Sequence, residues 1–376
     1  MTDQPSRVDD RYATNERYTT LRGLRRDAER RLSQIDWNYL WCGTGDEVTL
    51  RENTDAFDRP RFDTPLFAGV ANPDTSTRVL GYDLSFPAFI APFGGGERQF
   101  HPDGHLAIGR AAEAAGIHQM VPVAAGHSLE EVAGVSNVAS IFQMTFVGSE
   151  DGVLALIERA KAAGYRHICV TYSPIRQWRE RMMEDRFSIR GETGPSNFGP
   201  GKSDPAALHE LLDFKQPRWT WEQAARVIRQ SPLPCIVKGI AGVADAGKAM
   251  EAGAIGLYVS NYGGRTIDRV PATLDILPKV RKAVGGNVPI ILDSGVRRGS
   301  DIALAIALGA NAVALGRLIA LGLAADGQDG VHRTLELLKR EFWTTLGHLG
   351  CSHVRELGLH VIAEGARTTA AASSSE

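Results

Sequence analysis

Short apolar runs alternate with longer amphipathic runs along most of this chain. The short runs are rich in β-branched and aromatic residues, which is typical of buried strands, and the longer runs repeat apolar residues at helical spacing. The pattern predicts strands at Ala88–Ala91, His118–Val123, Ser140–Gln143, His167–Thr171, Pro234–Lys238, Gly256–Ser260, Pro289–Asp293 and Ala312–Leu315. It predicts helices at Gly104–Ala115, Gly152–Ala163, Trp221–Gln230, Ala244–Ala252, Leu274–Val284, Asp301–Leu308 and Gly330–Leu346. Eight strands in this rhythm predict a parallel (β/α)8 barrel, the TIM barrel of the α/β class.

Two other arrangements are less compatible with the pattern. An open doubly wound sheet would have fewer strands and a glycine-rich turn after the first one, but no G-x-G-x-x-G follows Ala91. A membrane span is suggested by the long apolar run Ile302–Ala325. That run contains Arg317, and an arginine at the bilayer centre costs about 2.5 kcal/mol or more. We therefore predict a helix, a loop, a buried strand and a second loop there.

Two segments lie outside the barrel rhythm. Residues 17–80 form an N-terminal extension that starts with a helical run, Glu16–Ile35. Residues 172–219 form a long insertion after the fourth strand, rich in glycine, proline and charge, and such loops are usually lids or binding loops. The predicted organisation is a disordered tail at residues 1–16, one barrel domain at residues 17–363, and a second disordered tail at residues 364–376.

Composition narrows the functional classes. The chain has 376 residues, 43% of them hydrophobic, and a formal net charge of -2, which predicts a globular protein with a large core and no basic surface for nucleic acid. The cysteines are far apart and form no C-x-x-C pair, so neither a disulfide framework nor a zinc site is expected. The polar N-terminus has no apolar signal segment. We expect a cytoplasmic protein without a membrane partner.

Polar and cationic residues gather where the predicted strands end, which is the catalytic face of a barrel. In the loops after strands seven and eight, Gly295 and Gly316 allow close approach of the backbone to a ligand. Arg297 and Arg317 follow in the same loops, and each guanidinium can fork a phosphate. These loops are the usual phosphate position in this fold. The pattern favours a phosphate site over arginines that simply pair with surface carboxylates.

At this point the residues carry a family resemblance over about residues 30–362. The chain resembles the FMN-dependent 2-hydroxy acid oxidases and dehydrogenases, the glycolate and lactate oxidase family. The matching segments, in the family's order, are Tyr39, Gly45–Asn53 (GDEVTLREN), Phe89–Pro92 (FIAP), His101–Gly104 (HPDG), Phe142–Met144 (FQM), Val237–Ile240 (VKGI), Val259–Asp268 (VSNYGGRTID), Asp293–Asp301 (DSGVRRGSD) and Leu315–Arg317 (LGR). VSNYGGRTID and DSGVRRGSD are highly specific. The resemblance implies a bound FMN and, by analogy, a homotetramer.

The resemblance also implies which residues hold the cofactor. The implied FMN contacts are Pro92 and Gly94 at the first strand end, Gln143, Thr171 and Lys238 at the isoalloxazine ring, Ser260 near the ribityl chain or ring edge, Asp293 at the ribityl hydroxyls, and Gly295, Arg297, Gly316 and Arg317 at the phosphate. An ungapped alignment puts the family's threonine on Val170 rather than Thr171. A cation at Lys238 would stabilise the anionic reduced flavin.

A clamp for a substrate carboxylate is implied as well. Arg265 matches the family's main carboxylate-binding arginine, and Tyr39 matches the tyrosine that donates its hydroxyl to the carboxylate. The second arginine of the clamp aligns with Trp178, so Arg179 would serve only after a local shift. Thr145 stands at the position of an active-site tyrosine after the third strand. These groups predict a small carboxylate substrate.

The catalytic base departs from the family pattern. The family has histidine in S-N-H-G-G-R, supported by an aspartate after the fourth strand; here these positions hold Tyr262 and Tyr172. No histidine lies between residues 210 and 331, so a shifted register does not restore the base, and only His209 of the insertion could fold over the site.

Chemistry follows from that replacement. A phenol has a pKa of about 10 and an imidazole about 6.5, so Tyr262 needs a pKa lowered by about three units, roughly 4 kcal/mol, to act as a base at neutral pH. Arg265 and Lys238 act in that direction, whereas a bound carboxylate opposes them. Ordinary 2-hydroxy acid oxidation is therefore expected to be slow.

Three functions remain open. The first is an FMN oxidoreductase with a changed substrate, such as an amine whose nitrogen lone pair drives hydride loss, with Tyr262 as hydrogen-bond donor or proton shuttle. The second is a redox-neutral or oxygen-inserting FMN enzyme. The third is an inactive FMN-binding scaffold, which the retained clamp argues against. Molecular oxygen is the expected electron acceptor, because no haem-domain pattern precedes the barrel.

Overall fold

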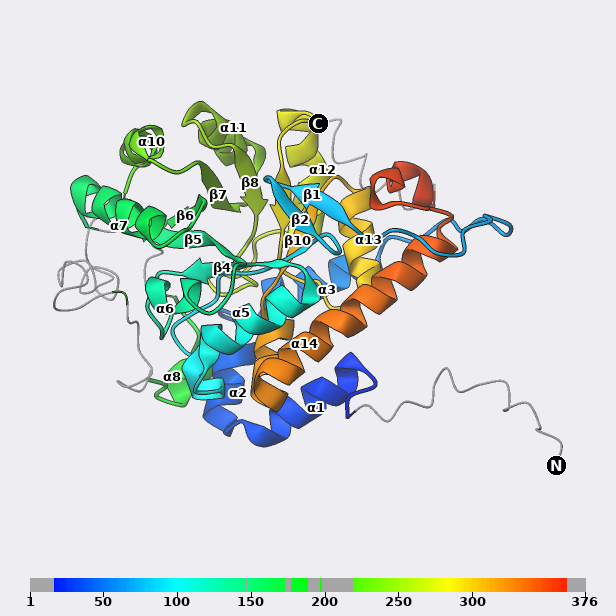
Figure 1. The fold of residues 1–376 in the computed structure, drawn as a ribbon, viewed down its shortest axis with the longest axis horizontal. Helices are drawn as coiled ribbons and strands as arrows, with labels where there is room; N and C mark the ends of the chain where they lie inside the picture. Colours follow the sequence, from blue (N-terminus) through cyan, green and yellow to red (C-terminus); the bar gives the residue numbers. More distant parts are fainter. Residues whose placement is uncertain (1–16, 147, 173–176, 189–196, 198–218, 364–376) are drawn as a thin grey trace.

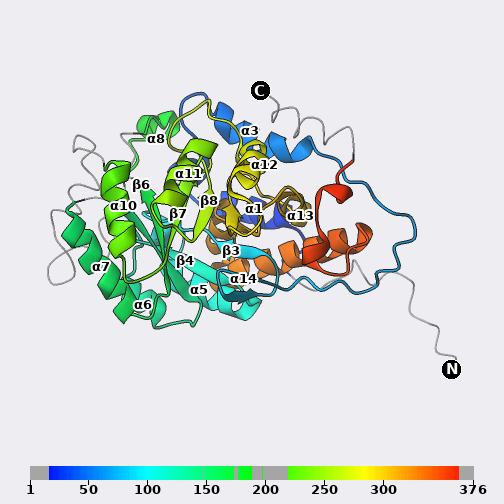
Figure 2. The same cartoon turned by 90° about the horizontal axis from the view of Figure 1, so that it is seen from above.

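The computed structural model describes residues 17–146, 148–172, 177–188, 197 and 219–363. Its parallel strands close into a barrel in the order β10-β3-β4-β5-β6-β7-β8-β9 (Figure 2). The barrel strands are β3 (Ala88–Ile90), β4 (His118–Pro122), β5 (Ala139–Phe146), β6 (His167–Tyr172), β7 (Cys235–Ile240), β8 (Gly256–Val259), β9 (Ile290–Leu292) and β10 (Ala312–Leu315). Every predicted strand is present, so the predicted TIM barrel is confirmed.

Helices surround this barrel (Figures 1 and 2). They are α4 (Glu97–Phe100), α5 (Gly104–Ala115), α6 (Leu129–Ala133), α7 (Glu150–Ala162), α8 (Glu180–Glu184), α10 (Trp221–Gln230), α11 (Val243–Glu251), α12 (Thr273–Val284), α13 (Gly299–Ala307) and α14 (Arg317–His348). The bounds of α5 and α10 agree with the sequence prediction. Because helices cover the outer face of the barrel, its strands are apolar on both faces.

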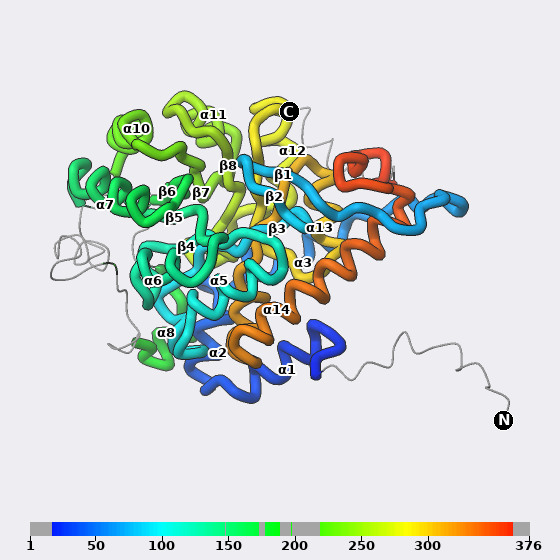
Figure 3. The backbone as a smooth tube through the Cα atoms, viewed as in Figure 1, coloured from blue at the N-terminus to red at the C-terminus, as the bar shows by residue number. Residues whose placement is uncertain are grey.

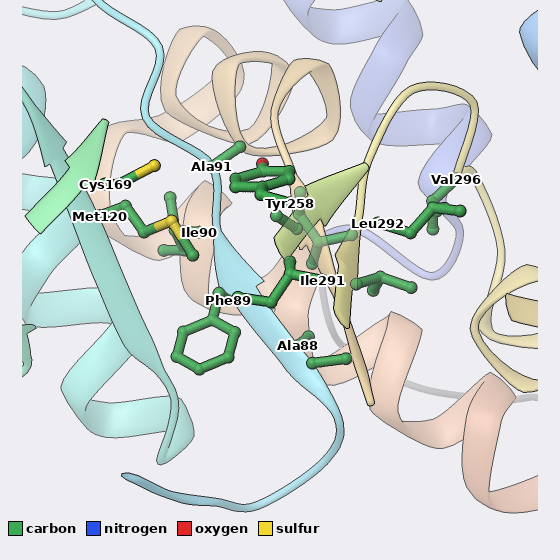
Figure 4. Close-up of a cluster of buried hydrophobic side chains, with 14 of the residues drawn as sticks. Ala88, Phe89, Ile90, Ala91, Met120, Cys169, Tyr258, Ile291, Leu292 and Val296 are labelled. Carbon is green, nitrogen blue, oxygen red and sulfur yellow. The ribbon is translucent and has the colours of Figure 1, made fainter. Parts of the chain in front are cut away.

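The interior of the barrel is filled by large side chains. Figure 4 shows Ile90, Met120 and Leu292 among these residues, with the ring of Tyr258 packed in the same cluster. All four are buried, and so is Asp293 at the end of β9. The Tyr258 hydroxyl donates a hydrogen bond to Asp293 Oδ2 at 2.8 Å, so this buried phenol has the partner that burial of a polar group requires.

The N-terminal extension contains α1 (Leu21–Arg31), α2 (Gln34–Trp41) and α3 (Val48–Asp58). The single helix predicted at Glu16–Ile35 is wrong, because the chain is extended at Leu32 and α2 starts anew at Ser33. The Ser33 hydroxyl caps α2 by accepting a hydrogen bond from the Asp36 amide at 3.1 Å. Helix α1 packs along α14 (Figure 1).

After α3 the chain runs beside the C-terminal residues (Figure 3). Isolated bridges join Phe62 to Ile362 and Asp74 to His353. The extension then ends in the hairpin β1 (Thr77–Val79) and β2 (Tyr82–Leu84), and the C-terminal segment forms the 3-10 turns η2 (Val354–Glu356) and η3 (Leu359–Val361). The two ends of the described chain therefore stabilise each other outside the barrel.

Helix α14 begins directly after β10, which corrects the loop predicted between the last strand and Gly330. A bend at Asp326 and Gly327 divides it, and Gly327 has a φ of 57°. On either side of the bend, Gly322 and Gly330 touch so closely that a Cβ on Gly330 would overlap the Gly322 carbonyl oxygen. These two glycines allow the two halves of the helix to meet.

Several sequence predictions concern residues outside the described ones: the two tails, most of the insertion and His209. Of the insertion, the structure describes α8 and a few neighbouring residues, and Asn197, whose side chain bonds to Leu129 and Val123. Among the described helices, none is both long enough and apolar enough to cross a bilayer.

Candidate active site at the mouth of the barrel

A cavity of about 280 Å³ opens at the carboxyl ends of the strands. Most of the predicted site residues line it, namely Tyr39, Pro92, Gly94, Arg179, Lys238, Tyr262, Arg265, Asp293, Gly295, Arg297, Gly316 and Arg317. The other predicted residues, Gln143, Thr145, Thr171 and Ser260, are not among the lining residues. The barrel thus brings together loops that are up to about 280 residues apart in sequence, as its topology requires.

Arg317 forms one end of the cavity. Its guanidinium donates to the carbonyl oxygens of Leu40 at 3.3 Å and of Cys42 and Gly263 at 3.0 Å. Burial lowers its pKa well below the usual value, and the positive charges of neighbouring arginines, Arg265 first among them, add to this effect. In the described part of the chain, no carboxylate forms an ion pair with Arg317. A buried cation without a counter-charge favours binding of an anion.

Arg297 lies at the same end. Burial lowers its pKa to about 10, and its guanidinium donates to the Val296 carbonyl oxygen at 2.8 Å. The nearby Asp301 carboxylate is engaged elsewhere, because it accepts hydrogen bonds from the backbone amides of Arg297 and Arg298 at 2.7 and 2.9 Å. The two arginines predicted to hold a phosphate therefore both line the cavity, and neither forms an ion pair with a described carboxylate.

The two glycines of this region have different roles. Gly316 lines the cavity as the residue before the first turn of α14, so the positive end of a helix dipole lies at the arginine end. Gly295 has a φ of 122°, and a Cβ there would overlap the carbonyl oxygen of Asn53 in α3. Gly295 is thus required by contact with the N-terminal extension, a reason that the sequence did not reveal.

Lys238 is buried and lines the cavity. Its ammonium donates to Ser260 Oγ at 2.8 Å and lies 3.5 Å from Asp293 Oδ2. The same nitrogen lies 4.8 Å from the ring centre of Tyr258 and 4.1 Å from that of Tyr262. A carboxylate, a hydroxyl and two aromatic rings therefore fix this cation in a site that is otherwise desolvated.

The residues of the predicted carboxylate clamp line the same cavity. Arg265 donates to the carbonyl oxygens of Tyr39 at 2.6 Å and Leu40 at 3.3 Å, and it lies 5.1 Å from the Tyr39 ring centre. The Tyr39 hydroxyl donates to the Gly94 carbonyl oxygen at 3.2 Å, and burial raises its pKa. Leu40 is thus an acceptor shared by Arg265 and Arg317.

The position of Arg179 fits the second clamp arginine that the local shift would supply. Arg179 lines the cavity, whereas Trp178 is 54% exposed. Burial and the neighbouring Arg265 lower the pKa of Arg179 to about 10. Two guanidinium groups that repel each other at the same end of a cavity create a second position that favours an anion.

The pKa of Tyr262 is shifted in the direction opposite to the one that a base needs. Its hydroxyl hydrogen-bonds Thr171 Oγ1 at 2.5 Å and donates to the Lys238 carbonyl oxygen at 3.4 Å. Burial raises its pKa well above the usual value, so desolvation outweighs the nearby cations and the phenol keeps its proton at neutral pH. A Cβ on Gly239 would overlap this hydroxyl, which shows that the glycine makes room for the phenol.

The residues beneath the cavity form a second layer. The Tyr172 ring meets the Tyr262 ring edge to face, with centroids 5.6 Å apart, as the predicted pairing of the two positions requires. Tyr172 itself is 49% exposed. Thr171 lies behind the Tyr262 hydroxyl, and Gln143 makes a long hydrogen bond of 3.5 Å to Thr145. Of these residues, Thr171 and Tyr172 contact Tyr262.

Sequence reasoning missed the contacts that hold the S-N-Y-G-G-R loop. The side-chain amides of Asn53 and Asn261 bond reciprocally at 2.9 and 2.7 Å. Asp268 accepts hydrogen bonds from the amides of Val48 at 3.2 Å and Thr49 at 2.8 Å, which caps α3 from another part of the chain. Both contacts join residues more than 200 positions apart, and no local pattern indicates them.

These residues fit the FMN that the sequence predicts. The phosphate would be held by Arg297, Arg317 and the N-terminus of α14, where both guanidinium groups are buried and neither forms an ion pair with a described carboxylate. Asp293 and Lys238 would hold the polar parts of the ribityl chain and the ring. The residues of the predicted carboxylate clamp line the same cavity.

Comparisons with known proteins agree with this picture. The model of the FMN-dependent dehydrogenase family matches residues 28–364. The chain is 37% identical over 338 residues to glycolate oxidase 3 of Arabidopsis thaliana, covering 88% of this chain and 92% of that protein. It is 37% identical over 344 residues to an L-lactate oxidase of Nostoc sp., covering 88% and 94%. A crystal structure of mandelate oxidase has a TM-score of 0.84 and 34% identity, covering 92% of this chain and 98% of that one.

Proposed function

Because this chain belongs to the FMN-dependent dehydrogenase family, we propose that it uses FMN to oxidise a small carboxylate whose α-carbon bears an amine. One observation carries the proposal. The base position holds Tyr262, a phenol whose pKa is raised by burial, while the carboxylate clamp still lines the cavity. A substrate that needs no protein base fits this combination better than an alcohol does.

The carboxylate is the part of the substrate supported by the clamp. Arg265, Arg179 and the Tyr39 phenol lie at one end of the cavity, and a planar carboxylate matches the fork of a guanidinium. The relatives are named for glycolate, lactate and mandelate, which are small 2-hydroxy carboxylates. The proposal keeps their carboxylate and changes the group beside it.

The choice of an amine rather than an alcohol follows from which protons must be removed during oxidation. When the α C–H bond breaks with its electron pair, the lone pair of a neutral amine forms the C=N bond, and the resulting iminium ion is hydrolysed by water. That hydrolysis would give a 2-oxo acid and ammonium. A bound FMN would supply the hydride acceptor, and O2 with two protons would take up the two electrons as hydrogen peroxide. An alcohol would also have to give its O–H proton to a base, and Tyr262 does not accept one at neutral pH.

The residues of this chain assist in two ways. Lys238 provides the positive charge that favours transfer of negative charge to the ring. Lys238 and Arg265 together oppose a second positive charge on the substrate, so they lower the pKa of a bound ammonium group and favour the reactive neutral amine. The hydrogen bond between the Tyr262 hydroxyl and Thr171 keeps the phenol ring of Tyr262 in place beside the Lys238 ammonium.

Anaerobic flavin bleaching tests the proposal. Amino and hydroxy acids with the same side chain are compared in pairs, so the two members differ only at the α substituent. The amino member should bleach the flavin about 100-fold faster or more. Its rate should rise with pH as the pH approaches the pKa of the substrate ammonium group. Equal rates within each pair would contradict the proposal.

The same measurements separate the other two functions. Full FMN loading without bleaching by any carboxylate tested would favour the inactive scaffold. In aerobic turnover with 18O-labelled O2, label in the organic product would favour oxygen insertion, and turnover without O2 consumption would favour redox-neutral chemistry. Each of these outcomes replaces the proposed amine oxidation.

A further inference from the structure

Trp41, the last residue of α2, lies against the phosphate end of the cavity. The guanidinium carbon of Arg297 lies 5.4 Å from the centre of its ring. The guanidinium carbon of Arg25 in α1 lies 4.4 Å from the same ring. Trp37, one helical turn earlier, stacks on Trp41 with centroids 5.7 Å apart and an interplanar angle of 5°. Two cations therefore share one indole that a second indole holds in place.

The contact matters because Arg297 has little else to fix its position. Within the described residues its guanidinium makes no ion pair, and it bonds to the carbonyl oxygen of Val296 beside it. An aromatic face attracts a cation more strongly when the cation is desolvated, and tryptophan has the strongest face. Burial of Arg297 is the main cause of its lowered pKa, so this condition is met.

A neutral ring also differs from a carboxylate in what it leaves available. A carboxylate partner would orient Arg297 but would neutralise its charge and compete with a phosphate. Trp41 orients the guanidinium without removing its charge. Arg25 adds positive charge on the same ring and is one cause of the lowered pKa of Arg297. The ring therefore holds two like charges that a bound anion would then stabilise.

We propose that Trp41 is a positioning residue of the cofactor-phosphate site, whose indole face holds the Arg297 guanidinium in place for the phosphate. This rests on the proposed placement of the phosphate at Arg297 and Arg317. Trp41 acts through Arg297 and does not touch the reacting atoms. Its effect is therefore confined to ligands that carry the phosphate.

Two flavins separate this role from a general effect on the fold. FMN and riboflavin differ only in the phosphate, and each is titrated into the apoprotein while its fluorescence is followed. Trp41→Leu should raise the Kd of FMN about 3- to 30-fold, the range expected for a cation–π contact, and leave the Kd of riboflavin within twofold. Equal losses for both flavins, or an FMN loss below twofold, would overturn the proposal.

Trp37→Leu is the matched control, because it removes the stacked indole from the same helix but not the ring over Arg297. It should raise the Kd of FMN relative to that of riboflavin less than Trp41→Leu does. A double-mutant cycle completes the test: in an Arg297→Ala background, Trp41→Leu should cause no further loss of FMN affinity. If Arg297→Ala alone leaves FMN affinity unchanged, the phosphate placement fails rather than the role of Trp41.

Fluorinated tryptophans placed only at position 41 keep the shape of the ring and weaken its negative face. They avoid the risk that Trp41→Leu fails to fold. The Kd of FMN should rise stepwise with the number of fluorines, while that of riboflavin stays constant. A flat FMN series in correctly folded protein would refute the cation–π contact.

Discussion

Restoring an imidazole at position 262 tests why this site departs from hydroxy-acid oxidation. The double change Tyr262→His and Tyr172→Asp places a base and a supporting carboxylate where two rings now meet with centroids 5.6 Å apart. The backbone tolerates the first change, because Tyr262 has a φ of 58° and histidine is among the residues enriched in the left-handed region.

The expected gain follows from the two pKa values. At pH 7.5 a phenol with a pKa of 10 or more is ionised in roughly one molecule in 300 or fewer, whereas an imidazole near 6.5 is unprotonated in about nine of ten. Since burial raises the pKa of Tyr262 further, this comparison is a lower limit. The population of competent base rises about 300-fold, which corresponds to about 3 kcal/mol of barrier.

Stopped-flow bleaching of the flavin under anaerobic conditions measures this gain with glycolate, L-lactate and mandelate. The double variant should reduce the flavin about 100-fold faster than the parent or more. Tyr262→Phe is the control, because it removes the hydroxyl bonded to Thr171 without adding a base, and it should give no gain. A double variant with full FMN and a parent-like Tm that bleaches within threefold of the parent would refute the reasoning.

Four further results are expected. Arg317→Glu puts a negative charge at the phosphate end and should give nearly colourless protein, as FMN absorbance per chain will show; full loading would contradict the phosphate site. Arg265→Ala should lower kcat/KM on the true substrate roughly 30- to 1000-fold, with Arg265→Lys in between; an unchanged value would exclude the clamp role. Burial, reinforced by Arg166, lowers the pKa of His118 and His167 from 6.5 to about 4. The contribution of these two residues to the free energy of unfolding should therefore be constant above pH 6.5 and fall as the pH decreases toward 4. A Tm that does not change between pH 6.5 and pH 4 would argue against it. Light scattering should give the mass of a homotetramer rather than 40.7 kDa.

The parts of the fold that were predictable are those encoded locally. Each barrel strand is a short apolar run between turn residues, so its position is visible without neighbours. The phosphate arginines were predictable because Arg297 and Arg317 follow strands whose ends must meet at one face. The loop predicted before Gly330 is wrong, because residues 317–325 are helical. They continue the apolar run of β10, so periodicity alone does not separate the strand from the helix.

The parts of the site that escaped prediction depend on contacts between distant segments. Arg179 lines the cavity whereas the neighbouring Trp178 is exposed, and no local pattern indicates which of the two does so. The raised pKa of Tyr262 depends on how deeply the loop is buried, and its charged neighbours alone suggested the opposite direction. The contact of Trp41 with Arg297 joins residues of the extension and the barrel, and neither residue carries a local sign of the other.

The carbonyl oxygen of Leu40 accepts hydrogen bonds from both Arg265 and Arg317. An anion that draws one guanidinium toward itself therefore changes the geometry available to the other. Thermodynamic reciprocity then requires that occupancy of the phosphate end and of the carboxylate end alter each other's affinity by the same factor. If FMN and the substrate bind these arginines as proposed, cofactor loading and substrate capture would form a heterotropic pair, with the Leu40 peptide group as the element that couples them.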